Sequence, residues 1–239
     1  MMRCLALLLM LACDPADVGV VLPQGGPDAV TADDLRRDLW TYTDPRIGGR
    51  APGSSGARRV AQAVAQQFQR AHLRPAFGGG YQKDLGAEHG ELVCGVRPGG
   101  GAGAVAVVAL DPGVGVMSAM PIAGLVALTR AFDGVDSLDR TFIFCLLPES
   151  GGLDGYVAHP PHPLSTTSQL VILGSLTGQV HQRSAGPSLA GISSEIWHTG
   201  PLAPELADDM GRLDYEAVVT QVRTVFSKLT EYSPASGEQ

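Results

Sequence analysis

Four short runs of apolar and often β-branched residues constrain the fold of this chain more than any other feature. They are residues 91–96 (ELVCGV), 104–110 (AVAVVAL), 141–147 (TFIFCLL) and 169–176 (QLVILGSL). Runs of this length without polar alternation are typical of strands that are covered on both faces. We therefore expect them to form the core strands of one sheet that is sandwiched between helices.

Segments with helical periodicity stand before, between and after these strands. The first begins at Thr31, a good N-cap that is followed by two acidic residues, and the last begins at Asp214, between Leu213 and Val218 as stapling residues. A third spans residues 121–132, with a proline in its first turn. A fourth repeats apolar residues every three or four positions on one face: Val60, Val64, Phe68 and Ala71.

The alternation of strands and helices predicts the class of fold. We expect a single three-layer α/β domain over residues 31–232, with a mostly parallel (mixed) central sheet flanked by helices, and a flexible tail over 233–239. No internal repeat and no second apolar core indicate another domain. In such folds the functional residues lie in loops at the carboxyl ends of strands, here the loops that begin at Asp111 and Glu149.

The N-terminus has the pattern of an export signal. One arginine precedes a nine-residue apolar run from Cys4 to Ala12, which is too short to span a bilayer. The MLAC sequence at 10–13 resembles the motif at which bacterial lipoproteins are lipidated on cysteine. We expect a signal peptide over 1–12, a lipid anchor at Cys13, a tether over 13–30 and a location in the bacterial envelope, on the periplasmic or cell-surface side. A misassigned start or a disordered tail is the alternative.

Charge and cysteine content limit the partners and the redox chemistry. The net charge of −7 and the absence of any Lys/Arg-rich block argue against nucleic acid as a partner. Cys94 and Cys145 each lie inside a strand-like run. A disulfide requires Cα atoms within about 7 Å of each other, which the sequence does not establish, so we expect buried thiols.

Several familiar sites do not fit the sequence. The GVGVMS segment (113–118) follows a strand but lacks the third glycine of a dinucleotide fingerprint, and no Gly-Lys-Ser/Thr phosphate loop exists. Neither serine-glycine segment has the G-x-S-x-G spacing of a serine hydrolase. Prolines surround His159 and His162 without other ligands at metal-binding spacing, so this segment is predicted to be a surface loop.

Taken in order, the loops resemble the family of di-zinc aminopeptidases, which includes bacterial leucyl aminopeptidases and, more remotely, glutaminyl cyclases. The resemblance runs from about Leu35 to Leu229 and begins with a loop at the substrate cleft. That loop is matched by Arg50, Pro52, Gly53 and Ser54. The segments AVAVVALDPG, TFIFCLLPESGGLDG, EIWHTGPL and the final helix match later parts of the family pattern. The resemblance implies an aminopeptidase fold, a peptide substrate and two zinc ions.

Most of the family's metal ligands are absent from the matching positions. Ala109 and Ser175 stand where a histidine and an aspartate ligand are expected. Asp111 stands where the family has an aspartate that supports this histidine without binding metal. Glu149 takes the place of the general base, and Ser150 that of the glutamate ligand beside it. No Asp, Glu, His or Cys occurs in residues 112–132, where the bridging aspartate belongs.

His198 is the one evident ligand that remains. A catalytic zinc needs about three protein ligands and an open position. We therefore expect no zinc, a packing role for His198, a solvated or structural role for Glu149, and a turn capped by Asp111.

Three hypotheses follow from this ligand count. The first is a non-catalytic pseudo-peptidase that binds or scaffolds another protein. The second is an active zinc hydrolase with one metal held by His198, Glu149 and a third ligand, either Asp154, His159 or His162. The third is a module that docks peptides in the vestigial cleft near Arg50 and His198.

Overall fold

The computed structural model describes residues 25–113, 115, 117–174, 181–185, 189–192, 194–199 and 210–231. The expected signal peptide, Cys13, most of the tether and the C-terminal tail lie outside these residues. Residues 25–30, which we expected to belong to the tether, pack on the domain. The Gly26 N–H donates to the Ala131 carbonyl at 2.7 Å, and Val30 is fully buried. The packed part of the chain therefore begins several residues before Thr31.

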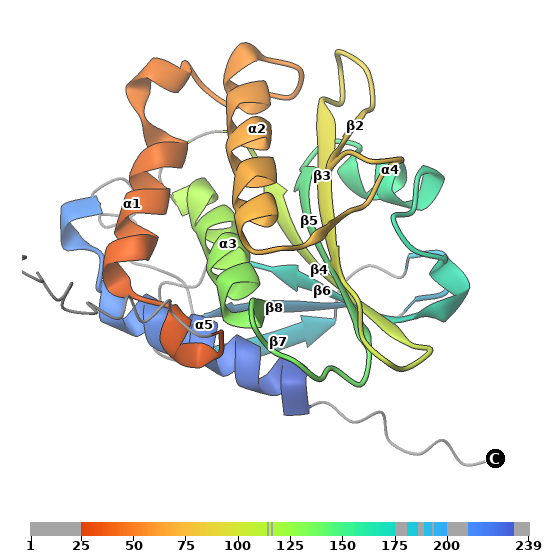
Figure 1. The fold of residues 1–239 in the computed structure, drawn as a ribbon. Coiled ribbons are helices and arrows are strands. Elements are labelled where there is room, and N and C mark those ends of the chain that lie inside the picture. Colours follow the sequence, from red (N-terminus) through yellow and green to blue (C-terminus); the bar gives the residue numbers. More distant parts are fainter. Residues whose placement is uncertain are drawn as a thin grey trace, which may run out of the picture.

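An eight-stranded mixed sheet forms the centre of the molecule, with the strand order β1-β3-β5-β4-β6-β8-β7 and β2 paired to β3 (Figure 1). The strands are β1 (Arg74–Pro75), β2 (Gln82–Asp84), β3 (Glu91–Arg97), β4 (Ala104–Asp111), β5 (Thr141–Pro148), β6 (Thr167–Leu173), β7 (His181–Ala185) and β8 (Ser194–Thr199). Strands β5, β4, β6 and β8 run parallel, and antiparallel strands complete both edges. The predicted mixed α/β sheet is confirmed, with all four expected core strands in it.

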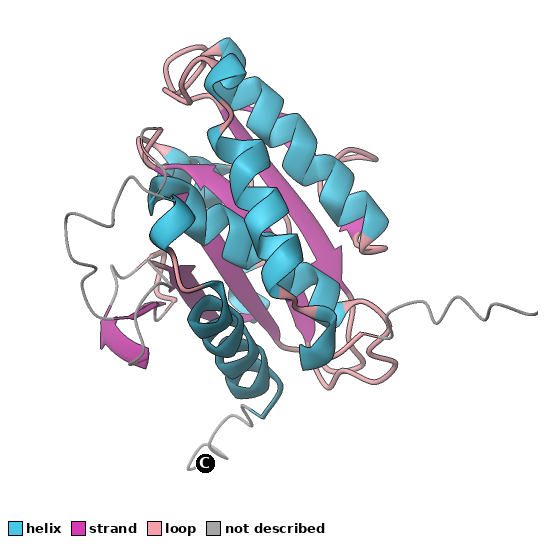
Figure 2. Cartoon of the chain, turned by 90° about the vertical axis from the view of Figure 1, so that its left-hand side faces the viewer, coloured by secondary structure: helices cyan, strands magenta, loops and turns pink. Residues whose placement is uncertain are grey.

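The helical layers on the two faces of the sheet are unequal (Figure 2). The helices are α1 (Ala32–Thr43), α2 (Ser55–Arg70), α3 (Met120–Phe132), α4 (Gly152–Ala158) and α5 (Tyr215–Glu231). The larger apolar core lies between one face and helices α1, α2, α3 and α5, whereas the smaller core on the other face includes Tyr156 of α4. Helix α3, buried along nearly its whole length, lies at the centre of the larger layer.

Local sequence signals explain where these helices begin. The Thr31 hydroxyl accepts a hydrogen bond from the Asp34 N–H at 3.2 Å, and Asp214 accepts one from the Ala217 N–H at 3.0 Å. Each therefore satisfies an N–H that the first helical turn would otherwise leave free. Both predicted caps are confirmed, and Leu213 and Val218 are both buried in the larger core.

An aromatic cluster joins α3 and α5 to the sheet. The Phe132 ring lies 4.5 Å from Phe142, 5.3 Å from Phe144 and 4.9 Å from Phe226, measured between ring centroids. These apolar residues come from two helices and one strand, and each is nearly or fully buried. The cluster fixes α3 on the sheet, and with it the loop that leads from β4 into α3.

A disulfide joins Cys94 and Cys145, so the expectation of free thiols is wrong. The two residues are directly opposite in the antiparallel pairing of β3 and β5, with Cα atoms 4.3 Å apart. Cross-strand pairing brings side chains this close on one face of a sheet, and both cysteines are fully buried. The two cysteines are 51 residues apart in the sequence, so their proximity could not be predicted without the strand pairing.

Among the described residues, no helix has the length and apolar character needed to cross a membrane.

Candidate functional site

The two loops that the sequence singles out lie side by side at one edge of the sheet. Strand β4 ends at Asp111 and pairs in parallel with β5, so that Asp111 stands beside Pro148. The Glu149 N–H donates to the Asp111 carbonyl at 3.1 Å and continues this pairing past the end of β5. The site is therefore built on the carboxyl ends of two central strands, where α/β folds ordinarily bind their ligands.

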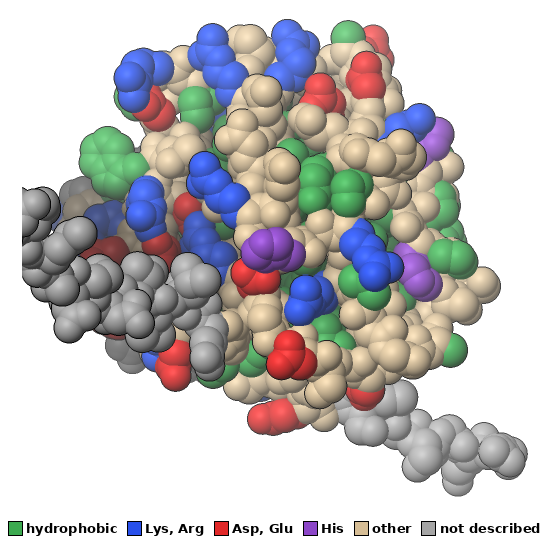
Figure 3. Space-filling view, in the orientation of Figure 1, with side chains coloured by type: hydrophobic (Ala, Val, Ile, Leu, Met, Phe, Trp, Pro, Cys, Tyr) green, Lys and Arg blue, Asp and Glu red, His purple; other side chains and the backbone are tan. Residues whose placement is uncertain are grey.

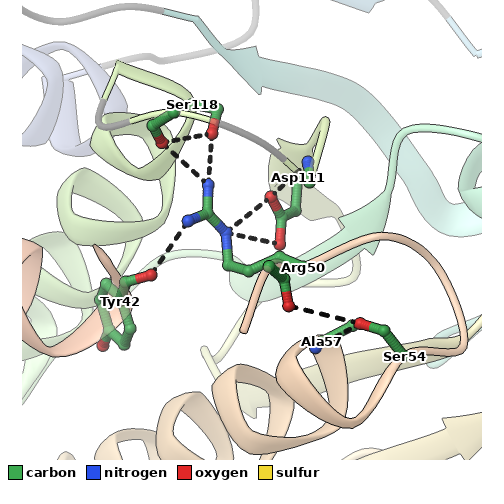
Figure 4. A network of polar contacts seen from close by, with 9 residues as sticks. Tyr42, Arg50, Ser54, Ala57, Asp111 and Ser118 are labelled. Atoms are coloured by element: carbon green, nitrogen blue, oxygen red, sulfur yellow. Dashed lines mark hydrogen bonds and ion pairs between the residues drawn. The ribbon is translucent and has the colours of Figure 1, made fainter. Parts of the chain in front are cut away.

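A buried ion pair between Arg50 and Asp111 occupies this edge (Figure 4). The Arg50 Nε lies 3.1 Å from Asp111 Oδ1 and 3.3 Å from Oδ2, and the two side chains are only 5% and 9% exposed. The Arg50 Nη1 donates to the Tyr42 carbonyl at 3.0 Å. Its Nη2 donates to the Gly115 carbonyl at 3.2 Å and to the Ser118 hydroxyl. The guanidinium therefore has a partner on each of its three nitrogens.

The same residues tie three segments of the chain together. The Asp111 Oδ1 accepts a hydrogen bond from the Gly113 N–H at 2.9 Å, so Asp111 caps the turn after β4 as predicted. The Arg50 N–H donates to the Gly113 carbonyl at 3.0 Å. Through Arg50, the loop after α1 is bound both to the β4–α3 loop and to the last turn of α1.

A small cavity lies between this network and the start of α2. Its volume is about 30 Å³, room for one or two water molecules. The lining residues come from the 50–53 loop, the first half of α2 and the ends of β3, β4 and β5: Arg50, Pro52, Gly53, Ala57, Arg58, Ala61, Gly90, Glu91, Asp111, Leu146 and Pro148. The chain thus places three of the four predicted cleft-loop residues around it.

Tight packing explains why this loop contains Gly53, and helix capping explains the next residue, Ser54. Gly53 has a φ of +72°, and a Cβ there would lie 1.8 Å from the Ala87 carbonyl oxygen. Ser54 is the N-cap of α2, because its hydroxyl accepts a hydrogen bond from the Ala57 N–H at 3.0 Å. Ser54 thus belongs to the same loop but does not line the small cavity, and its place in the substrate-cleft set stays a prediction.

The positions to which the resemblance assigns zinc chemistry lie at or near the carboxyl ends of the parallel strands, but those described offer few donor groups. Ala109 is fully buried within the larger core and has no donor atom to offer. Glu149 and Ser150 are both exposed at the turn after β5. His198 belongs to β8, opposite Gln182 of β7, but its side chain lies outside the described part of the structure, as does the whole of Ser175.

The described residues do not form a cage for zinc. Asp154 and His159 are exposed on and just after α4, and the His162 Nδ1 lies 3.1 Å from the Thr166 hydroxyl. No group of three or more His, Cys, Asp or Glu that could hold a metal occurs among the side chains that the structure describes. Asp111, for which the resemblance implied a supporting role, has Arg50 as its partner.

Sequence reasoning missed the pairing of Arg50 with Asp111, although a signal for it existed. Each is a charged residue beside a buried strand or within a glycine-rich loop, and a buried charge is found with a partner of opposite sign. The pair is 61 residues apart in sequence. Only the fold shows that both side chains are buried, and burial is the reason each charge needs a partner of opposite sign.

The fold is that of the zinc-dependent exopeptidases and glutaminyl cyclases, as the resemblance in sequence implied. A leucine aminopeptidase precursor from Bacteroides thetaiotaomicron superimposes with a TM-score of 0.66 at 11% identity, over 88% of this chain and 99% of that one. The glutaminyl cyclase of the same organism gives 0.63 at 11% identity, over 89% and 100%. An aminopeptidase from Aneurinibacillus sp. strain AM-1 gives 0.64 at 9% identity, over 85% and 94%.

These likenesses are in the fold alone. No protein-family model matches the sequence, and no curated protein matches it. With about one residue in ten identical, the backbone arrangement is shared while the side chains at the functional edge are free to differ.

Proposed function

We propose that this protein is a non-catalytic pseudo-peptidase of the bacterial envelope that acts by binding or scaffolding. The observation that carries the proposal is the residue found at two positions where the resemblance implies metal ligands: the buried Ala109 side chain has no donor atom, and the exposed Ser150 has no carboxylate. Beside these positions the buried Arg50–Asp111 pair holds the loops together, and all three guanidinium nitrogens of Arg50 have partners.

The donor set supports the same proposal. Ala109 has no lone pair, and the exposed Glu149 has no metal-bound water to deprotonate unless a ligand set is rebuilt around it. A protein that acts by binding a partner on its surface needs the fold but does not need a zinc centre. The vestigial cleft near Arg50 and His198 is one place where a peptide ligand could dock, and nucleic acid is not proposed as a partner.

Export is supported by the disulfide. The structure contains the Cys94–Cys145 disulfide. Disulfides form and persist in oxidising compartments such as the periplasm and are rare in the cytosol. A lipid on Cys13 would then hold the domain at the membrane through the residues that precede Gly25. Incorporation of a labelled fatty acid tests this anchor. The label should appear in the wild-type chain and be lost in Cys13→Ala, and equal labelling of both chains would refute the anchor.

Metal content and turnover test the absence of catalysis. The purified chain, equilibrated with zinc and desalted, should retain less than about 0.2 zinc per molecule, because no three-ligand cage is available. It should release no product from aminoacyl-nitroanilides and cyclise no N-terminal glutamine. Stoichiometric zinc, with turnover that chelators and Glu149→Gln both abolish, would refute the proposal and establish the single-zinc hydrolase in its place.

A further inference from the structure

A groove runs between α1 and α2 on the outer side of the helical layer. Both helices pack on α3, which lies beneath them (Figures 1 and 2). Two adjoining hollows of about 490 and 510 Å³ share Thr41 of α1 and Ala63 of α2, so they form one continuous depression. Each hollow has the size of a typical ligand pocket. Val60 and the α3 residue Arg130 contribute to its lining from below.

The wall that α2 contributes has a regular pattern. Arg59, Ala63, Gln66 and Arg70 follow one another at intervals of four, three and four residues and all line the groove. This spacing places them on one face of the helix. Eleven residues at 1.5 Å each put Arg59 and Arg70 about 16 Å apart along the helix axis. The small Ala63 and the amide of Gln66 lie between the two cations.

The carboxylates that line the groove pair with arginines other than Arg59 and Arg70, so these two can bind an anionic ligand. Asp34 pairs with Arg37, Asp38 with Arg130 and Asp44 with Arg46.

Within the part of the chain that the structure describes, neither Arg59 nor Arg70 forms an ion pair with a carboxylate. The Arg59 Nη1 instead donates to the Arg46 carbonyl at 2.6 Å. Residues 45–75 contain no Asp or Glu, although the whole chain has a net charge of −7. Figure 3 shows the resulting concentration of Lys and Arg over the α1–α2 part of the surface.

We propose that the groove between α1 and α2 binds an acidic segment of a partner protein, whose carboxylates contact Arg59 and Arg70. Arginine is suited to this role because its planar guanidinium can bind a carboxylate through two hydrogen bonds. Gln66 and Gln67 lie between the cations and can bond to the backbone of a peptide. Trp40, which is 56% exposed on α1, lines a neighbouring hollow that shares Thr41 with the groove, and exposed tryptophans are enriched at interfaces.

The shape and charge of the groove favour a peptide over other anionic partners. A bilayer is flat and would contact the rims of a concave site without entering it. A nucleic acid carries a charge on every nucleotide and would bring phosphates close to Asp34, Asp38 and Asp44, whereas a peptide segment can place its carboxylates opposite the two arginines alone. The groove also lies on a different face of α2 from Ala57 and Ala61, which line the small cavity beside Arg50. The inference is therefore independent of whether the chain has catalytic activity.

Peptide length and two matched variants test the proposal. We expect a fluorescein-labelled hepta-glutamate peptide to bind the full chain in an anisotropy titration at physiological salt. Tri-glutamate has a backbone of only about 10 Å when extended, shorter than the separation of the two arginines along the helix axis, and should bind at least tenfold more weakly. Arg59→Gln/Arg70→Gln should weaken hepta-glutamate binding at least tenfold. Arg74→Gln/Lys83→Gln removes the same charge outside the groove and should change the affinity less than twofold.

A variant that fills the groove separates shape from charge. Thr41 is exposed at the middle of the groove, so Thr41→Trp should leave the fold intact, as circular dichroism can verify, and reduce hepta-glutamate binding at least fivefold. Unchanged binding by this variant, or equal losses in the two double variants, would overturn the proposal. Tighter binding to phosphatidylglycerol vesicles or to a single-stranded oligonucleotide than to hepta-glutamate would also overturn it.

Discussion

Removal of the Arg50 charge should destabilise the protein strongly. In Arg50→Met the buried Asp111 carboxylate loses its cation and keeps only the Gly113 N–H, while the Tyr42 and Gly115 carbonyls each lose a donor. Breaking a buried ion pair from one side typically costs 3–5 kcal/mol, because the remaining charge is left uncompensated in a poorly solvated place. We expect a loss of about 3–5 kcal/mol in the free energy of unfolding, measured by urea denaturation.

A double-mutant cycle distinguishes this ion pair from simple loss of packing. In Arg50→Met/Asp111→Asn both charges are gone, and the asparagine oxygen can still accept from the Gly113 N–H. The double variant should therefore be more stable than Arg50→Met alone. The sum of the losses in free energy of unfolding of Arg50→Met and Asp111→Asn should exceed the loss of the double variant by about 2 kcal/mol or more. Additive losses, or a loss below about 1 kcal/mol in Arg50→Met, would refute the buried pair as the element that closes this site.

Further predictions concern the disulfide, an exposed carboxylate and the turn after β5. Replacing both cysteines, Cys94→Ala/Cys145→Ala, should lower the free energy of unfolding by roughly 4 kcal/mol, the chain-entropy value for a 51-residue loop; a loss below about 1 kcal/mol would contradict this. Hydrogen bonds from the Arg46 side chain and N–H lower the pKa of Asp44 to about 2. Carbon-13 NMR should show this pKa rising toward its ordinary value in Arg46→Gln, and in the wild type any stabilisation from Asp44 should be lost as the pH falls from about 4 to about 2. Because Glu149 is exposed, Glu149→Gln should change the free energy of unfolding by less than about 0.5 kcal/mol in the same denaturation assay, and a larger loss would assign it a structural partner.

The accuracy of the sequence predictions depends on how local each signal is. The predicted core strands and the capped helices α1 and α5 were found because apolar runs and caps act within a few residues. Strands β1, β2, β7 and β8 were not predicted. Strands β1, β2 and β7 are short or polar segments at the edges of the sheet, and β8 mixes polar and apolar residues. An edge strand forms because a neighbour offers free backbone groups, and its own sequence carries a weak signal. Helix α4 was not predicted either, because it begins in a glycine-rich stretch and has no side-chain cap.

The sequence by itself determined the layered α/β architecture and the two strand-end loops, because residue type and periodicity are properties of the chain. It also places Ala109 and Ser150 where the resemblance implies metal ligands, which stays a prediction. Only the tertiary structure decided which distant groups meet. It joined Cys94 to Cys145, turned Arg50 inward to Asp111 and set Arg59 and Arg70 along an open groove. These contacts depend on strand register and helix packing, which bring together residues that are far apart in sequence.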